Sequence, residues 1–568
     1  MNEHALLHIM DSQMSFPISK NKIVIRLRAS REDKDAKVYL VYGPKFTYQI
    51  TREEIPMEIK YTDKLFNYYE VTLDLKDTRL AYVFRFEQNG ENFYFSEDGL
   101  TKTYDFQQSF YNFFQMPFIN EIDVMPLVDW MKYAVFYQIF IDRFSIGDRE
   151  NIKHTNLKWG EKPNQFSFAG GDIQGIIDKL DYLQELGINT LYLTPIFTSP
   201  SNHKYNTIDY YEIDSHFGDK KIFGKLVKEL HRRDMKIVLD AVFNHISDES
   251  YIFSDVKEKG KKSRYYDWFY IDGEFPDSEK VNYLNFAFVN YMPKLKTSNP
   301  QVQDFLINIG KYWIESFDID GWRLDVSDEV SHDFWKRFRK EIKSIKEDVV
   351  ILGENWHDSY SYLQGDQFDS IMNYSFTKAS LDYFKGIIST EEMSNKLNHI
   401  LTRNKDQVNR MNLNLLDSHD THRIFTELDN NKNKVLAALA LLIVYMGVPC
   451  IYYGTEIFLE GGYDPDSRRT FDWNKLNEVA ELDMIKEIIS IKGNKSISDG
   501  DIKIESNNGT LIVTRNYLEE TIKLIINLEE KQTIETENYE VLIKNNFEKN
   551  ILNKDGFIIL KQRSKYEN

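Results

Sequence analysis

The sequence predicts an α/β protein built around a closed (β/α)8 TIM barrel, with an N-terminal β-sandwich domain and a C-terminal antiparallel β-domain. Between about residues 130 and 490, apolar strand candidates alternate with helical patterns. Eight such strands can be identified, which favours a closed barrel over an open doubly wound sheet. The segments before and after this region contain short β-rich runs separated by turn residues, which indicates antiparallel β-structure.

The predicted domains follow these changes of pattern. Residues 1–122 form the predicted sandwich, in which Asn89-Gly90 lies between two aromatic strands and indicates a hairpin. Residues 123–490 form the predicted barrel, with an inserted subdomain after the third strand, at about residues 246–300, that is too long for an ordinary barrel loop. Residues 491–568 form the predicted C-terminal β-domain.

Two segments of the predicted barrel show how its helices and strands are assigned. Apolar residues recur at helical spacing from Ile173 to Leu186, and Gly187 is predicted to end that helix before the strand "INTLYLT". The segment from Val435 to Tyr453 has no charged residue and is long enough to suggest a membrane span. The Gly447-Val448-Pro449 break instead predicts a buried helix followed by a short buried strand.

Composition narrows the classes of partner. The 568 residues carry a formal net charge of −18, which opposes binding to nucleic acid or to an anionic membrane because phosphate is repelled. Cys450 is the only cysteine, so an internal disulfide is excluded, as is typical of a reducing compartment. The N-terminus lacks the cationic head and apolar core of a secretory signal. We therefore expect a cytoplasmic protein that acts on a neutral or cationic small molecule.

Polar residues gather at the predicted carboxyl ends of four strands, where the active sites of such barrels lie. They are Asp240, Asn244 and His245 after the third strand, Arg323 and Asp325 on the fourth, Glu354 after the fifth, and His419 and Asp420 after the seventh. Seen singly, an aspartate could cap a helix, Glu354 could be a solvated loop residue, and His419 a core histidine. Arg323 and Asp325 could form a structural ion pair. Their coincidence at four strand ends favours a functional site.

Two carboxylic groups on neighbouring strands suit retaining glycoside hydrolysis. One attacks the anomeric carbon, while the other protonates the departing oxygen and then activates water, at a separation of about 5–5.5 Å. Asp325 and Glu354 meet this requirement. Arg323 shares a strand face with Asp325, so we expect its charge to keep Asp325 ionised as the nucleophile. Glu354 must be protonated, so we expect it in a drier position near negative charge, and Asp420 could stabilise developing positive charge.

At these residues the sequence resembles glycoside hydrolase family 13, the α-amylase family. "DAVFNH", "GWRLDV", "GENW" and "SHD" match its four main motifs in order, and "GVPCIYYGTE" matches its eighth-strand motif. Within the family, the sequence is most similar to the neopullulanase, cyclomaltodextrinase and maltogenic amylase group, through "SPSNHKYNTIDYYEID", "MPKLKT", "GDQFDSIMNY" and "GGYDPDSRR". The resemblance covers almost the whole chain and implies that the N-terminal β-domain is starch-binding-like.

The resemblance also implies a role for each matched residue. It makes Asp325 the nucleophile, Glu354 the proton donor and Asp420 the transition-state stabiliser. The implied contacts to the sugar at the cleaved bond are His245, Arg323, His419 and the stacking Tyr205. The implied substrate-binding pair of the "DPDSRR" motif is Asp464 and Arg468, and the implied aromatics of the acceptor side are Trp356, Phe286 and Tyr374. Without the resemblance, each aromatic would be read as a core residue.

Some positions depart from the family pattern. Asp328 stands in "VSDE" where Asn is usual, and His422 stands in "HDTHR", so linkage preference and the balance of transfer and hydrolysis stay open. A calcium site of related enzymes would correspond to Asp148, Asn151, the Gly170 carbonyl and Asp172, but Ile146 and Ile152 replace two oxygen donors. Because calcium takes about six to eight oxygens, either a calcium site or a polar loop without metal is compatible with the sequence. No organic cofactor is expected.

The implied function is retaining hydrolysis of α-1,4-glucosidic bonds, with some α-1,6 cleavage, in cyclodextrins, pullulan and maltooligosaccharides. The resemblance also implies a homodimer in which each N-terminal domain covers the active site of its partner. A 4-α-glucanotransferase or an α-glucosidase on the same barrel is the alternative enzyme. A carbohydrate-binding protein without catalysis is the alternative from another class, although the presence of all three carboxylates argues against it.

Overall fold

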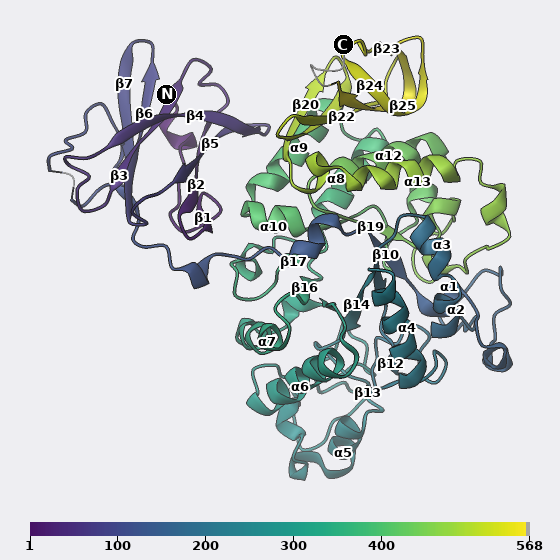
Figure 1. Cartoon of the computed structure of the whole chain (residues 1–568). Helices are drawn as coiled ribbons and strands as arrows, with labels where there is room; N and C mark the ends of the chain where they lie inside the picture. The colour runs from purple at the N-terminus through teal and green to yellow at the C-terminus, as the bar shows by residue number, and fades with distance from the viewer. Residues whose placement is uncertain (109, 564–568) are drawn as a thin grey trace. The chain divides into compact units, whose positions relative to one another are not determined.

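The computed structural model describes residues 1–108 and 110–563, apart from the side chains of residues 151 and 152 (Figure 1). It divides into two compact units. The first comprises Met1–Leu127, Ile388–Arg410 and Ile502–Thr514, and the second comprises Val128–Ile387, Met411–Asp501 and Arg515–Asn568. The domain boundaries at residues 122 and 490 stay predictions.

The N-terminal strands form an antiparallel β-sandwich. They are β1 (Ser15–Ser19), β2 (Lys22–Ser30), β3 (Lys37–Pro44), β4 (Glu53–Thr62), β5 (Phe66–Asp74), β6 (Leu80–Gln88), β7 (Glu91–Ser96), β8 (Gly99–Thr101) and β9 (Phe114–Met116). Their order is β1-β2-β5-β4-β3-β6-β7-β8, with β9 beside β6. Residues 53–57 of β4 pair with β3 and its residues 58–62 pair with β5, so this strand connects the two layers.

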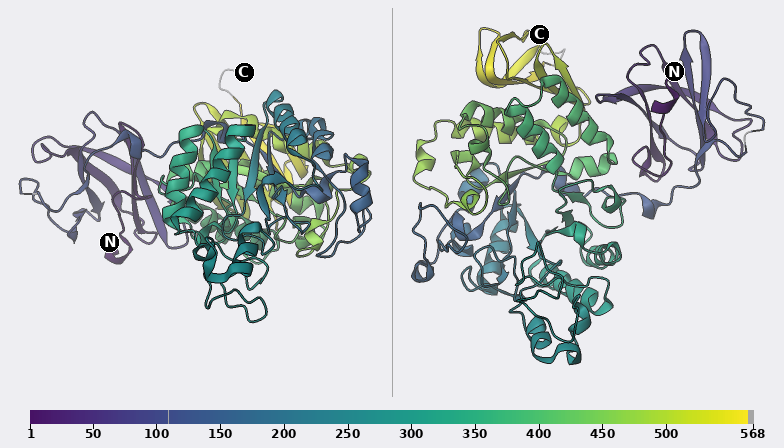
Figure 2. Two further views of the ribbon diagram at one scale, coloured as in Figure 1. Left: turned by 90° about the horizontal axis from the view of Figure 1, so that it is seen from below. Right: turned by 180° about the vertical axis from the view of Figure 1, so that it is seen from behind.

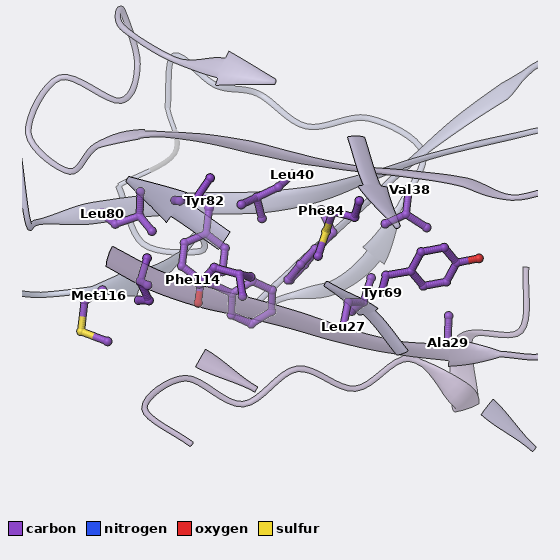
Figure 3. Close-up of a cluster of buried hydrophobic side chains, with 14 of the residues drawn as sticks. Leu27, Ala29, Val38, Leu40, Tyr69, Leu80, Tyr82, Phe84, Phe114 and Met116 are labelled. Atoms are coloured by element: carbon purple, nitrogen blue, oxygen red, sulfur yellow. The ribbon is translucent and has the colours of Figure 1, made fainter. Parts of the chain in front are cut away.

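Apolar side chains of the two layers meet in one core (Figure 3). Leu27 of β2 and Tyr69 of β5 come from one layer, and Leu40 and Phe84 come from β3 and β6 of the other. Side chains that point to the inner face of each layer produce this arrangement, although β2 and β6 are buried along most of their length. The predicted hairpin is confirmed, because β6 and β7 are joined by Asn89-Gly90, both at positive φ. Helices α9 (Thr390–Thr402) and α10 (Asp406–Met411) follow later in the chain.

The second unit contains a closed barrel of eight parallel strands. They are β10 (Phe136–Ile139), β11 (Thr190–Leu193), β14 (Lys236–Ala241), β15 (Gly321–Leu324), β16 (Val350–Gly353), β17 (Ser370–Ile371), β18 (Leu413–Leu415) and β19 (Val448–Tyr452). They follow the order β17-β16-β15-β14-β11-β10-β19-β18, and every pair is parallel. A parallel bridge between Met372 and Leu413 closes the ring. The predicted barrel and its eight strands are confirmed.

Helices lie outside the barrel strands (Figure 2). They are α1 (Ile141–Phe144), α2 (Ile173–Ile177), α3 (Leu180–Glu185), α4 (Lys220–Arg232), α6 (Pro300–Phe317), α7 (His332–Ile345), α8 (Tyr374–Phe384), α11 (Ile424–Glu427), α12 (Lys432–Val444), α13 (Leu482–Ser490) and α14 (Lys495–Ser498). Local sequence sets their starts: Asn299 and Ser331 accept backbone N–H groups at the first turns of α6 and α7. Phe223, Leu226, Val227 and Leu230 form the buried face of α4.

The structure corrects one predicted helix and confirms another. The helix predicted from Ile173 to Leu186 is wrong as a single element, because Lys179 has φ −110° and ψ 7° and separates α2 from α3. The apolar segment is the buried helix α12 followed by the buried strand β19, as predicted. Among the residues placed in this structure, no helix has the length and apolar character needed to cross a membrane.

The remaining elements lie between the barrel strands in the chain or follow the last of them. β12 (Phe197–Thr198) and β13 (Asp209–Ile213) form a small antiparallel sheet between β11 and α4. The predicted insertion contains helix α5 (Tyr251–Lys259) and two short 3-10 helices, Gly260–Lys262 and Tyr266–Trp268. After the barrel come β20 (Asp501–Asn507), β21 (Thr510–Tyr517), β22 (Glu520–Asn527), β23 (Gln532–Thr533), β24 (Tyr539–Glu548) and β25 (Ile551–Gln562). They form a six-stranded sheet in which β22, β23 and β24 pair antiparallel with β25, as the predicted C-terminal β-domain requires.

Candidate active site

The fully buried guanidinium of Arg323 lies at the centre of the candidate site. Arg323 and Asp240 stand opposite each other in the register of β15 and β14. The Arg323 Nη1 donates to both oxygens of Asp240, at 2.9 and 3.0 Å, and to Asp325 Oδ1 at 2.9 Å. Its Nη2 lies 2.8 Å from Glu354 Oε1. One cation therefore faces three carboxylates at the carboxyl ends of three successive barrel strands.

Asp325 and Glu354 lie close to each other. They contact the two terminal nitrogens of the same guanidinium, and only 7 % of Asp325 and 6 % of Glu354 is exposed. Two carboxyl groups held in this way can adopt the separation of about 5–5.5 Å that retaining hydrolysis requires. Neither caps a helix, since Ser331 caps the helix α7 that follows Asp325.

The electrostatics of this cluster differ from the expectation that Arg323 simply keeps Asp325 ionised. Burial and the negative charge of Glu354 raise the pKa of Asp325 well above its usual value, and Arg323 opposes this only in part. Burial also raises the pKa of Asp240 to about 6, again against the effect of Arg323. Glu354 and Asp325 are almost equally buried, so the predicted difference between their surroundings stays a prediction. Arg323 thus contacts three buried carboxyl groups, and the pKa is raised for two of them, Asp325 and Asp240.

Glu354 is held by two further donors. The backbone N–H of Val326 donates to its Oε2 at 3.0 Å, and the indole N–H of Trp356 donates to its Oε1 at 3.3 Å. Val326 directly follows Asp325 and has φ 44°, in the left-handed region that a β-branched residue rarely adopts. The unusual backbone of Val326 thus aims its N–H at Glu354 and connects the two carboxyl groups through one peptide.

Asp420 belongs to a second group of contacts at the same end of the barrel, after β18. Its Oδ2 lies 3.1 Å from His419 Nε2, and its Oδ1 accepts from Arg468 Nη2 at 3.2 Å. Arg468 also pairs with Asp464 at 3.0 Å and donates to the carbonyl of His419 at 2.9 Å. Burial, followed by the charges of Arg468 and Arg323, lowers the pKa of His419 well below its usual value, so His419 is neutral.

Tyr205 connects the two groups of carboxylates. Its hydroxyl donates to Asp240 Oδ2 at 2.8 Å and lies 2.5 Å from His419 Nε2. The carbonyl of Tyr205 lies 3.1 Å from His245 Nε2. The ring of His245 stacks on Phe286 of the insertion, with centroids 4.8 Å apart. Burial lowers the pKa of His245 to about 3, so this ring is also neutral.

Two aromatic residues pack face to face beside Glu354. Trp356 and Tyr374, the first residue of α8, stack with centroids 3.8 Å apart and an interplanar angle of 7°. Trp356 is 45 % exposed, so the pair is accessible from solvent. Asp328 lies in the turn after Val326, and burial, with the charges of Glu329 and Glu354, raises its pKa.

The structure thus brings all of the predicted catalytic and substrate-binding residues to the carboxyl ends of the barrel strands or to the loops that follow them. Their individual roles stay predictions. Sequence reasoning missed Gln138, which contacts His419 from β10, and Tyr192, whose hydroxyl donates to Asp240 at 2.8 Å from β11. Both carry a polar group within a strand of mostly apolar residues. This pattern could have identified them as candidate site residues from the sequence.

Two of the predicted calcium ligands, Asp148 and Asp172, already accept hydrogen bonds from backbone N–H groups. Asp172 caps α2, and its two oxygens already accept backbone N–H groups from Gly147, Asp148 and Gly175, at 2.7 to 3.0 Å. The Asp148 carboxylate accepts from the N–H of Glu150 at 2.9 Å. No group of three or more His, Cys, Asp or Glu side chains is placed to hold a metal in the part of the chain that the structure describes. The side chain of Asn151 lies outside that part, so calcium binding stays a prediction.

Taken together, a (β/α)8 barrel with two buried carboxyl groups on adjacent strands and a third nearby defines a glycoside hydrolase. A protein-family model described as the alpha amylase catalytic domain matches residues 138–495, and the alpha amylase N-terminal Ig-like domain matches residues 1–120. The chain therefore belongs to the α-amylase family, glycoside hydrolase family 13, which confirms the resemblance found in its motifs.

Relatives extend this assignment over nearly the full length. The chain is 40 % identical over 554 residues to a cyclomaltodextrinase of Thermoanaerobacter pseudethanolicus, with 96 % of each chain covered. It is 42 % identical over 502 residues to an intracellular maltogenic amylase of Bacillus subtilis, covering 86 % of this chain and 84 % of that one. A solved cyclomaltodextrinase structure matches with a TM-score of 0.91 and 34 % identity, over 99 % of this chain and 100 % of that chain.

Proposed function

We propose that this protein hydrolyses α-1,4-glucosidic bonds in cyclodextrins, maltooligosaccharides and pullulan, with some α-1,6 cleavage, and that it retains the anomeric configuration. The observation that carries the proposal is the contact of Asp325 and Glu354 with the two terminal nitrogens of Arg323, at 2.9 and 2.8 Å. The names of the relatives, cyclomaltodextrinase and maltogenic amylase, support the choice of α-glucans as substrates.

In the first step, the Asp325 carboxylate attacks the anomeric carbon while Glu354 transfers its proton to the glycosidic oxygen. The bond from the anomeric carbon to that oxygen breaks, the shortened glucan leaves as an alcohol, and a covalent glycosyl ester forms on Asp325. Burial and mutual repulsion favour the retention of a proton beside Glu354, because they raise the pKa of the neighbouring Asp325 and Asp240. Arg323 orients both groups through its fixed fork.

In the second step, Glu354 acts as a base. Now ionised, it takes a proton from a water molecule, whose oxygen attacks the anomeric carbon and releases Asp325. Two displacements on opposite faces of the sugar retain its configuration. Both steps pass through a transition state with positive charge on the ring, which the Asp420 carboxylate can stabilise. His419 and His245 are neutral, so they add no positive charge beside the sugar ring.

The decisive variant is Glu354→Gln, which keeps the shape of the side chain and removes the exchangeable proton. We expect kcat on cyclodextrin to fall by roughly 10²–10⁴-fold, the usual contribution of general acid–base catalysis. Sugar binding, measured by calorimetry, should persist. Unchanged turnover would overturn the assignment of Glu354, and product of inverted configuration, detected by NMR early in the reaction, would overturn the retaining mechanism.

The preferred acceptor separates the proposed hydrolase from the alternative glucanotransferase. In both, the glycosyl group on Asp325 is transferred to a hydroxyl, either of water or of a second sugar. Product analysis at rising maltooligosaccharide concentration should show shorter products throughout for a hydrolase. Longer glucans as the main products would favour the transferase. The same analysis on cyclodextrin, pullulan and starch ranks the substrates and the two linkages.

We further propose that the protein forms a homodimer through its N-terminal domain and that it acts in the cytoplasm. Large apolar side chains exposed in that domain support the first proposal, since Ile50 is 86 % exposed and Tyr111 is 91 % exposed. The word "intracellular" in the name of the Bacillus subtilis relative supports the second. Sedimentation of the full chain should give a dimer, and Ile50→Asp should shift it towards monomer.

A further inference from the structure

Gln138 lies in the first barrel strand, β10, where its neighbours Tyr137 and Ile139 are completely buried and Gln138 itself is 1 % exposed. Its side-chain amide lies 2.7 Å from Nδ1 of His419. A buried amide costs free energy unless it is hydrogen-bonded, and an apolar residue would fill this strand position equally well. The amide must therefore contribute something beyond packing.

The contacts of His419 determine which ring nitrogen carries the proton. Nε2 lies 3.1 Å from a carboxylate oxygen of Asp420, and an ionised carboxylate can only accept. The Tyr205 hydroxyl, 2.5 Å from the same nitrogen, has its one proton directed to Asp240 and can accept a hydrogen bond at its oxygen. Nε2 must therefore be the protonated nitrogen. In a neutral ring, Nδ1 must then accept, and Gln138 supplies the N–H that it accepts.

The hydrogen bonds thus run in one direction through the site. Gln138 donates to His419, His419 donates towards Asp420 and Tyr205, Tyr205 donates to Asp240, and Asp240 accepts from Arg323. Arg323 in turn binds both Asp325 and Glu354. Reversing the tautomer of His419 would place a lone pair against the Asp420 carboxylate and leave Tyr205 with two acceptors for one proton. The tautomer is therefore coupled to the placement of all the carboxylates.

We propose that Gln138 is a positioning residue that fixes His419 as the neutral tautomer with its proton on Nε2, so that His419 holds the Asp420 carboxylate by a hydrogen bond and adds no positive charge beside the oxocarbenium-like transition state. This inference rests on the proposed glycosidase function. Gln138 touches no substrate and acts only through His419.

The charged and titratable groups around His419 favour the same state. They are Arg323 of β15, Arg468 of the loop after β19, His203 and Tyr205 of the loop after β11, and Asp420 of its own loop. Two of them, Arg323 and Arg468, are cations whose charges disfavour a protonated ring. Gln138 is a neutral donor, so it can fix which ring nitrogen of His419 carries the proton without adding a charge to the site. A carboxylate in its place would instead stabilise a proton on Nδ1.

The test compares Gln138→Met, which keeps the volume without the amide, and Gln138→Glu, which reverses the preference at Nδ1. For Gln138→Met we expect kcat/KM on cyclodextrin to fall by about 10- to 100-fold, the loss from one buried hydrogen bond. For Gln138→Glu we expect a fall in kcat and an additional ionisation in its pH profile near neutrality. A parallel loss with no change of pH profile in Gln138→Glu would indicate a packing role and overturn the proposal.

A double-mutant cycle with His419→Asn shows whether Gln138 acts through His419. If it does, Gln138→Met should cause little further loss once His419 is replaced. Additive losses would overturn the proposal. Long-range ¹⁵N–¹H spectra of histidine-labelled protein, with His419 assigned from the variant, should show the Nε2–H tautomer in the unchanged protein. This readout needs no activity and no folded Gln138 variant, and an Nδ1–H signal would overturn the proposal by itself. Absence of any α-glucan hydrolysis by the unchanged protein would instead overturn the proposed function.

Discussion

Strand β15 is bounded by two buried aspartates that have opposite surroundings. Asp320 precedes the strand, and its carboxylate pairs with Lys236 and Lys346, each at 3.0 Å, and with His231 at 2.9 Å. Asp325 follows the strand and shares Arg323 with two other carboxylates. At the amino end two lysines and a histidine surround Asp320, whereas at the carboxyl end three carboxylates share one cation.

The difference appears in the pKa of each aspartate. Burial alone would raise the pKa of Asp320, but His231, Lys346 and Lys236 outweigh it and lower the pKa to about 2. Burial and Glu354 raise the pKa of Asp325 well above the usual value despite Arg323. The cations around Asp320 make it a fixed anion that stabilises the fold, whereas burial and the neighbouring carboxylates favour a proton on Asp325. The aspartate at the amino end of β15 thus contributes to stability, and the aspartate at its carboxyl end contributes to chemistry.

The largest expected effect is on turnover, and it should appear at one end only. Asp325→Asn removes the proposed nucleophile and should lower kcat on cyclodextrin by about 10⁴-fold or more. Asp320→Asn changes the same atoms at the other end and should leave kcat per folded molecule unchanged. Steady-state kinetics on both variants, corrected for active folded protein, tests this. A comparable loss in Asp320→Asn would contradict the separation.

The free energy of unfolding should fall more in Asp320→Asn than in Asp325→Asn, the reverse of the effect on turnover. Asp320→Asn leaves two lysines facing a neutral amide and should lower the free energy of unfolding by about 3 kcal/mol, as loss of one partner of a buried ion pair does. Asp325→Asn relieves repulsion around Arg323 and should leave stability equal or higher. Urea denaturation followed by tryptophan fluorescence measures both. Equal destabilisation by the two variants would remove the basis of the comparison.

The pH dependence of stability should have opposite signs for the two aspartates. The folded pKa of Asp320 is lowered to about 2, so its stabilisation is complete above the unfolded pKa of about 3.9 and is lost as the pH falls towards 2. The loss should amount to roughly 2 kcal/mol and should be absent in Asp320→Asn. The folded pKa of Asp325 is raised, so its contribution falls as the pH rises above the unfolded pKa, and Asp325→Asn should flatten that decline. Denaturation curves of the unchanged protein and both variants between pH 2 and 7 measure these two contributions. A pH dependence of the opposite sign for either aspartate would contradict the prediction.

The smallest expected effect concerns a third buried aspartate, Asp172, whose oxygens accept hydrogen bonds from three backbone N–H groups. Because these bonds engage the carboxylate as a helix cap, removing divalent metal should leave kcat and the unfolding temperature unchanged. Dialysis against a chelator, with calcium added back to a second sample, measures both. A loss restored specifically by calcium would establish the metal site that the resemblance implies.

Periodicity was sufficient to predict the barrel because each of its eight strands is an apolar run bounded by turn residues. The alternation within "GWRLD" likewise placed Arg323 and Asp325 on one face. The sharing of Arg323 with Glu354 could not be predicted in this way, because it depends on how neighbouring strands stagger when the barrel closes. The positive φ of Val326 and the break at Lys179 are also set by packing, which overrides local preference.

The peptide between Asp325 and Val326 has a further significance for heat resistance. Holding a β-branched residue at φ 44° costs about 1–3 kcal/mol, and the strained peptide supplies the N–H that binds Glu354. Thermal motion that relaxes this one residue would let the glutamate swing free while the barrel strands stay paired. The enzyme should therefore stop working several degrees below its melting point, and should recover fully when cooled.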